Sequence, residues 1–98
     1  MCGIAGISGK SHLNFINILN DSLMHRGPDD SGVYSIKDKN ISIAMKRLSI
    51  IDLKLGQQPM IDHESQNVIV FNGEIFNASQ LRNDLLKKNV SFVSNNSD

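Results

Sequence analysis

The sequence has little of what marks a disulfide-stabilised, nucleic-acid-binding or membrane protein. One cysteine among 98 residues rules out an internal disulfide and favours a reducing, cytoplasmic location. Ten basic residues balance ten acidic ones, so the charge gives no footprint for nucleic acid or for an anionic membrane surface. The longest apolar stretches, 41–45 and 68–71, are far too short to span a bilayer. The N-terminus lacks a basic segment followed by a long apolar run, so we expect no signal peptide.

What remains is the composition of an ordinary globular domain, 40% hydrophobic and 20% charged. A chain of 98 residues is enough for one small domain. Such a domain buries only about 60–65% of the surface that its unfolded chain exposes, so we expect marginal stability.

Hydrophobic periodicity and turn residues predict a mixed succession of strands and helices. The expected elements are, in chain order, a buried strand over 1–8, a helix from a Ser11 cap to about Met24 with Leu13, Ile16, Leu19 and Leu23 at helical spacing, a loop over 25–32, a hairpin of strands 32–36 and 41–45, an irregular stretch over 46–60, a strand over 67–71, and a helix over 78–88. This order lacks regular alternation of strand and helix, which predicts the α+β class.

The second helix carries its own start and stop signals. Asn77 is a suitable N-cap, and Gln80 stands three residues later in capping-box position. Leu81, Leu85 and Leu86 are expected to form its buried stripe.

Cys2 follows the initiator methionine and would become the first residue if Met1 were removed. A terminal cysteine carries a thiol and an α-amine, and the amine has a reference pKa of about 7.7–8.0, so it can accept the thiol proton near neutral pH. The thiolate is the stronger nucleophile. The alternative is that Cys2 is simply a small buried hydrophobic residue, as most lone cysteines are.

Four short segments occur in series: MCGIAGI at the start, HRGPDDSG over 25–32, RLSIID over 47–52 and FNGEIFN over 71–77. In this order and spacing they resemble the N-terminal class II glutamine amidotransferase domain of glutamine-hydrolysing asparagine synthetases. The Pro-Asp-Asp run and RLSIID favour this branch over amidophosphoribosyltransferases and hexosamine-phosphate synthases. The resemblance implies an Ntn-hydrolase-type four-layer αββα sandwich. Residues 1–98 would be the N-terminal, incomplete portion of a type 2 glutamine amidotransferase domain.

The resemblance also implies the roles of individual residues. Cys2 matches the catalytic nucleophile, while Asn72 and Gly73 match the oxyanion hole. Without the resemblance, Asn72-Gly73 reads as a hairpin turn and Arg47 as a solvated surface arginine. The residues that match the glutamine-binding site are Arg47 for the α-carboxylate, Leu48, Ser49, Ile50 and Ile51 lining the pocket, Asn72 and Gly73, and Glu74 and Asp98 near the α-amino group. The chain reads Ser-Asp at its end where the family has Ser-Asp-Thr-Glu, so Asp98 could be out of register by one.

Other polar residues are assigned no catalytic role. His25 and Arg26 are interpreted as structural, with Asp29 and Asp30 setting turns in the same loop. His12 and His63 are expected to be exposed, and no cluster of His, Cys and Asp has the spacing of a metal site. Met45 stands where the family often has histidine.

The resemblance implies two partners, namely glutamine and a C-terminal synthetase domain in cis or in trans. ATP and magnesium are expected only in that synthetase domain, so this segment needs no cofactor. Neither a nucleic acid nor a membrane is expected as a partner. Two alternatives remain open: a non-catalytic remnant or partner-binding fragment of an amidotransferase, and an amidotransferase acting on another acceptor, such as a sugar or polysaccharide precursor.

Overall fold

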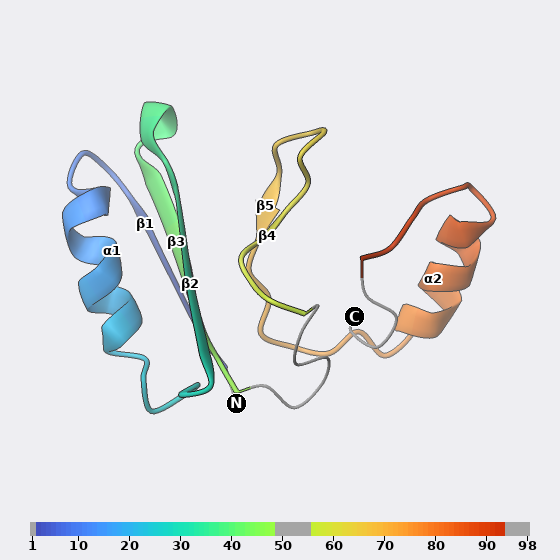
Figure 1. Cartoon of the computed structure of the whole chain (residues 1–98), viewed down its shortest axis with the longest axis horizontal. Helices are drawn as coiled ribbons and strands as arrows, with labels where there is room; N and C mark the ends of the chain where they lie inside the picture. The colour runs from blue at the N-terminus through green and yellow to red at the C-terminus, as the bar shows by residue number, and fades with distance from the viewer. Residues whose placement is uncertain (1, 49–55, 94–98) are drawn as a thin grey trace.

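A three-stranded antiparallel sheet organises the first half of the chain. The computed structural model describes residues 2–48 and 56–93. Its elements are β1 (Gly3–Ser8), α1 (His12–Asp21), β2 (Asp30–Ile36), a 3-10 turn (Lys37–Lys39), β3 (Ile41–Arg47), β4 (Met60–Ile61), β5 (Val68–Ile69) and α2 (Ala78–Leu86). The first sheet has the order β1-β3-β2, and β4 pairs with β5 in a separate two-stranded ribbon. Figure 1 shows the sheet with α1 on one face and the ribbon on the other side.

The β2–β3 hairpin confirms the prediction made from the sequence. It extends two residues beyond the predicted strands at its open end, where Asp30 pairs with Arg47. The closed end is the 3-10 turn followed by Asn40, whose φ of 52° lies in the left-handed region that Asn tolerates. β3 is therefore the central strand, with β1 on its other side pairing Gly3 with Lys46.

Helix α1 covers the sheet through a polar as well as an apolar contact surface. Its buried residues are His12, Ile16 and Asn20, which recur every four positions on one face. The prediction that His12 is exposed is wrong. The side chain is 2% exposed, and its Nδ1 lies 2.6 Å from the Ser42 hydroxyl of β3. That hydroxyl also lies 2.7 Å from the Ser35 hydroxyl of β2, so a short polar chain joins three elements.

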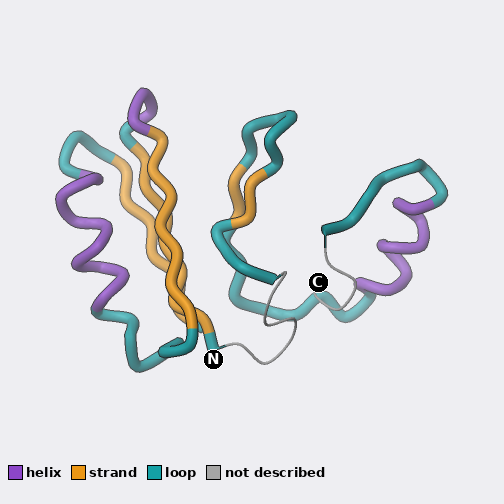
Figure 2. Tube along the Cα trace, in the orientation of Figure 1, coloured by secondary structure: helices purple, strands orange, loops and turns teal. Residues whose placement is uncertain are grey.

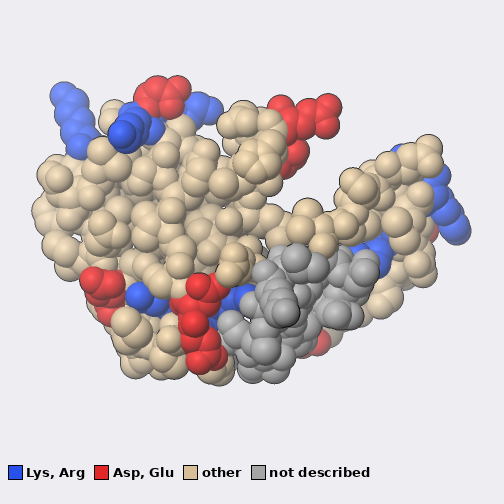
Figure 3. All heavy atoms as spheres, in the orientation of Figure 1, with Lys and Arg blue, Asp and Glu red and all other residues tan. Residues whose placement is uncertain are grey.

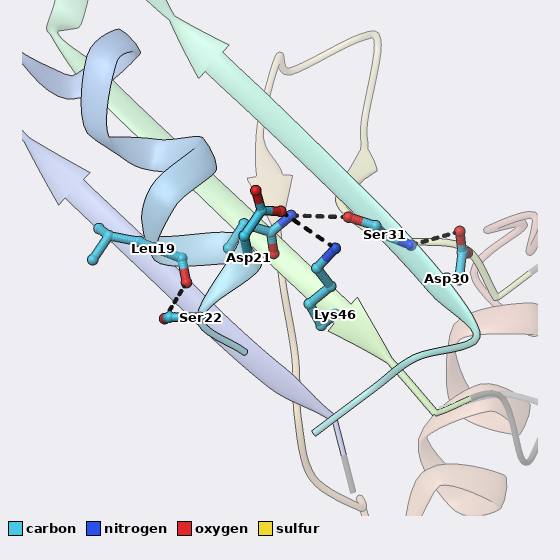
Figure 4. A network of polar contacts seen from close by, with 7 residues as sticks. Leu19, Asp21, Ser22, Asp30, Ser31 and Lys46 are labelled. Carbon is cyan, nitrogen blue, oxygen red and sulfur yellow. Dashed lines mark hydrogen bonds and ion pairs between the residues drawn. The ribbon is translucent and has the colours of Figure 1, made fainter. Parts of the chain in front are cut away.

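A second group of polar contacts joins the end of α1 to the open end of the sheet (Figure 4). The amide of Asn20 donates to the Ser31 hydroxyl at 2.9 Å. Lys46, only 5% exposed, extends its ammonium to within 3.7 Å of Asp21. Because alternate residues of a strand face opposite sides, Lys46 faces α1 and the next residue, Arg47, faces the other side of the sheet.

Several predicted boundaries and burials near α1 and β1 are corrected. α1 ends at Asp21 rather than near Met24, and turns follow it. The Ser11 side chain makes no capping hydrogen bond. The described part of the first strand begins at Gly3, and the prediction that the strand is buried fails at Ile4, which is 47% exposed on the face away from α1. The described residues leave that face of β1 largely uncovered, because Gly6 and Ser8 on it are exposed as well.

The second half of the chain is more open than predicted. The strand expected over 67–71 is only the two residues of β5, while Met60 of the stretch expected to be irregular belongs to β4. Figure 2 shows the ribbon as two short strands joined by a long loop. In that loop, hydrogen bonds from the Ser65 hydroxyl and then the Glu64 amide lower the pKa of Asp62. The loop is thus shaped by a local side-chain turn.

Helix α2 confirms the predicted position but not the predicted packing. It begins at Ala78 as expected and ends at Leu86, two residues early. Asn77 makes no side-chain capping bond, so the expected capping box is absent. Leu81, Leu85 and Leu86 are 44%, 38% and 50% exposed, so the predicted buried stripe is wrong for the helix as it stands. In Figure 1, α2 stands away from the first sheet, at the opposite side of the molecule.

Candidate functional site

Cys2 lies at the open end of the first sheet, just before β1. Its thiol is half-buried, and Sγ lies 3.8 Å from the carbonyl oxygen of Leu48, within reach of a weak S–H donor. Leu48 directly follows the central strand β3. Cys2 is therefore placed beside the end of β3, where the predicted glutamine-binding segment begins.

Asn72 reaches the same place from a distant part of the chain. Its Nδ2 donates a hydrogen bond of 2.9 Å to the carbonyl oxygen of Cys2, across a sequence separation of 70 residues. The Asn72 side chain is otherwise exposed. A side-chain amide has two N–H groups, so this bond leaves one of them to act as a donor next to the cysteine.

Gly73 follows Asn72 in a position where a side chain would collide with a neighbour. A Cβ on Gly73 would lie 2.8 Å from the ring of Phe71, closer than real Cβ contacts come. The residue is exposed on its outer side. The small residue thus lets the chain fold back over Phe71 while its backbone N–H stays near the open surface.

Arg47 is the last residue of β3 and is not a surface arginine. Only 6% of the surface of this residue is exposed to solvent. Its carbonyl oxygen accepts a hydrogen bond of 3.0 Å from the Asp29 amide, and Pro28 forms a parallel bridge with it. Since Lys46 extends toward α1, the alternation of side chains along β3 places the Arg47 side chain on the opposite face of the sheet.

The 25–32 loop is held against Arg47 by close backbone contact. A Cβ on Gly27 would lie 2.4 Å from the Arg47 nitrogen and from the Lys46 carbonyl carbon, so only glycine fits here. Arg26, in the same loop, donates from Nε to the Cys2 carbonyl oxygen at 3.4 Å. This bond to a backbone carbonyl is compatible with the structural interpretation of Arg26 and ties its loop to Cys2. Its contact with Cys2 has no sequence signal beyond its place in the HRGPDDSG segment.

The structure thus brings together Cys2, Arg47, Leu48 and Asn72, with Gly73 adjoining. Glu74 lies two residues past Asn72, on the exposed side of the same segment. Ser49, Ile50, Ile51 and Asp98, the remaining predicted site residues, lie outside the described residues.

Residues 2–48 and 56–93 hold no group of three or more His, Cys, Asp or Glu side chains that could bind a metal ion. None of the helices in this part of the chain is long and apolar enough to cross a membrane.

The sequence profile of the glutamine amidotransferase domain matches residues 1–98. The chain belongs to this family. In this amidotransferase domain, Leu48 and Asn72 both contact Cys2. The comparison with solved structures finds no match.

Relatives of this amidotransferase domain are named as asparagine synthetases. It is 36% identical over 99 residues to asparagine synthetase [glutamine-hydrolyzing] 1 of Bacillus subtilis, covering 94% of this chain and 15% of that protein. A second Bacillus subtilis asparagine synthetase is 38% identical over 92 residues, covering 87% of this chain and 12% of that protein. Asparagine synthetase [glutamine-hydrolyzing] 1 of Arabidopsis thaliana is 40% identical over 90 residues, covering 87% of this chain and 15% of that protein. The chain therefore spans only 12–15% of the length of these relatives.

Proposed function

We propose that this chain is the part of a glutamine amidotransferase domain that hydrolyses the side-chain amide of glutamine, with Cys2 as the nucleophile. The observation that supports it most directly is the 2.9 Å hydrogen bond from Asn72 to the Cys2 carbonyl. This bond places the side-chain amide of Asn72 next to Cys2, although the two residues are 70 positions apart in the sequence.

Removal of Met1 would make the α-amine of Cys2 the base. The amine takes the thiol proton, and Sγ bonds to the side-chain carbonyl carbon of glutamine. The carbonyl electron pair moves to oxygen, where the second Asn72 N–H and the Gly73 backbone N–H stabilise it. Collapse of this intermediate breaks the C–N bond, and ammonia leaves with the proton that the amine had taken. Water then hydrolyses the thioester, releasing glutamate and the thiol.

Substrate recognition would use the charged residues around this centre. A free amino acid presents a carboxylate and an ammonium, and the fork of Arg47 suits the carboxylate. Glu74 and Asp98 would offer negative charge to the ammonium. Burial of Arg47 at the end of β3 supports this role, because a desolvated guanidinium binds a carboxylate more strongly than an exposed one.

The proposed destination of the ammonia is a synthetase domain, in cis or in trans, that makes asparagine from aspartate and ATP. The printed names of the relatives support this acceptor, and their much greater length leaves room for such a domain. ATP and magnesium would serve that domain, and no step of glutamine hydrolysis uses them. In the complete domain, the β1-β3-β2 sheet would be one of the two stacked sheets of an αββα sandwich, with α1 in an outer layer. A cytoplasmic location is part of the same proposal.

The test is Cys2→Ala in the full gene product. Glutamine-dependent synthesis should disappear because no thioester can form, while ammonia-dependent synthesis should continue because it bypasses the nucleophile. Mass spectrometry of the active wild-type protein should show Cys2 as the first residue. Loss of both activities together, or a fully active protein that retains Met1, would refute the assignment.

A further inference from the structure

Gln58 holds the backbone of Phe71 with both ends of its side-chain amide. Nε2 donates to the Phe71 carbonyl oxygen at 3.1 Å, and Oε1 accepts from the Phe71 amide at 2.6 Å. A neighbouring antiparallel strand offers one residue the same pair of bonds. Since β5 ends at Ile69, two residues before Phe71, the Gln58 side chain takes the place of a strand partner here.

The backbone that carries Gln58 is itself anchored to the first sheet. A Cβ on Gly32 of β2 would lie 2.1 Å from the Gln58 carbonyl oxygen and 2.6 Å from Cδ of Pro59. Only a glycine lets these backbones lie so close together. Gly32 pairs with Met45 of the central strand, so Gln58 rests on the same sheet that ends at Arg47 and Leu48.

Because Phe71 directly precedes Asn72-Gly73, fixing its backbone also restricts the positions of these two residues. Its ring lies beneath Gly73, 2.8 Å from where a Cβ would stand. Asn72 directly follows Phe71 and hydrogen-bonds to Cys2. A continuous series of contacts therefore runs from β2 through Gln58 and Phe71 to the two proposed oxyanion donors.

We infer that Gln58 is a positioning residue for the oxyanion hole, an inference that rests on the proposed function. The side chain touches none of the proposed reacting groups and acts through Phe71. Without its two hydrogen bonds, the backbone just before Asn72 is no longer tied to the segment that lies on β2, and the Asn72–Cys2 hydrogen bond is left to hold Asn72-Gly73 in place. Displacements of about 1 Å can cost about 100-fold in rate. The loss falls on kcat, because the oxyanion exists only in the transition state and the intermediate.

The test compares Gln58→Ala with Gln57→Ala in the full gene product. Gln57 is the same residue type, adjacent in sequence and exposed, so it is the matched control. Gln58→Ala should lower kcat for glutamine hydrolysis by about 10–100-fold while changing KM by less than about threefold. Gln57→Ala should leave both constants at the wild-type values.

Two chemical probes separate a positioning role from general loss of structure. Glutamate γ-semialdehyde, the aldehyde counterpart of glutamine, adds the Cys2 thiol to form a tetrahedral adduct whose oxygen occupies the oxyanion hole. Its inhibition constant should rise by about 10-fold or more in Gln58→Ala. Iodoacetamide alkylates the thiolate with loss of iodide and needs no oxyanion hole, so the rate of Cys2 alkylation should change by less than about twofold.

The outcomes distinguish this inference from the proposed function. If Cys2→Ala retains glutamine hydrolysis, the proposed function has failed. If Cys2→Ala and Asn72→Ala are impaired but Gln58→Ala has wild-type kcat and aldehyde affinity, only the inference about Gln58 is overturned. Parallel losses of turnover and alkylation would overturn it too, by indicating general disorder. If Gln58→Ala does not fold, Gln58→Glu takes its place, since it retains the size and the acceptor for the Phe71 amide but sets a carboxylate against the Phe71 carbonyl.

Discussion

Most arginines lie at the protein surface, but Arg47 is buried, and its main chain is held by contacts with the 25–32 loop. Its carbonyl is bonded to Asp29, and Gly27 lies against its backbone nitrogen. A guanidinium retains its charge when buried, because its pKa is too high for deprotonation in proteins. In the proposed function, this fixed and charged side chain would bind the carboxylate of a free amino acid.

Replacing Arg47 by Ala should weaken glutamine binding more than turnover. A hydrogen bond to a charged group contributes about 1.5–3 kcal/mol, which corresponds to an increase of about 10–100-fold in KM. Arg47→Lys keeps the charge but loses the bidentate fork, so its KM should lie between the two. Steady-state glutaminase kinetics on the full gene product measure both, and an unchanged KM in Arg47→Ala would remove this residue from the binding site.

Among the secondary-structure elements, α1 shows why periodicity predicts a helix better than it predicts its buried face. The apolar residues of the helix lie on more than one side: Ile16 is 1% exposed, whereas Phe15 and Ile18 are 50% and 63% exposed. The face that packs on the sheet is decided by hydroxyl partners on β2 and β3, which lie far away in the sequence. The sequence of α1 contains no information about those partners. The same reason explains α2, whose leucines have the right spacing but are not buried by the described residues.

The buried polar chain under α1 should make His12 a stabilising residue. His12→Ala removes one of the two partners of the Ser42 hydroxyl, with Ser35 remaining as the other, and it leaves a cavity at a buried position. A hydrogen bond contributes about 0.5–1.5 kcal/mol and the cavity adds to the loss, so the free energy of unfolding should fall by about 1–3 kcal/mol. His63→Ala is the control. That histidine is exposed, so its replacement should change the free energy of unfolding by no more than about 0.5 kcal/mol. Denaturant unfolding of the two variants compares them directly, and equal stabilities would show that the network contributes nothing.

On the scale of the whole molecule, the hairpin and the approximate positions of both helices agree with what the sequence predicted, whereas the helix ends, the caps and the buried stripe of α2 do not. The contact between Cys2 and Asn72 could not be predicted from spacing, since nothing local connects residues separated by 70 positions. The contacts of Arg26 and Gln58 with the site were not predicted, because they depend on tertiary structure. Figure 3 shows charged side chains mainly near the edges of this face, with wide uncharged areas between them.

The 98-residue chain alone should therefore not be a competent glutaminase. Large apolar side chains are exposed on several elements, among them Ile4 at 47%, Ile18 at 63% and Phe76 at 96%. A sandwich needs two sheets that bury each other's faces, and the two-residue strands β4 and β5 are too short to cover β1 fully. Uncovered sheet and helix surface favours aggregation or partner binding.

This expectation is checked by purifying residues 2–98 and measuring glutamine hydrolysis, oligomeric state and the unfolding transition. We expect broad unfolding, self-association and turnover at least about 100-fold below that of the full gene product, because the Cys2 and Asn72 segments are held loosely when their supporting layers are missing. Addition of the remainder of the gene product in trans should restore turnover if the loss is one of packing. A soluble monomer with a sharp cooperative transition and full glutaminase turnover would show instead that these residues contain a complete catalytic unit.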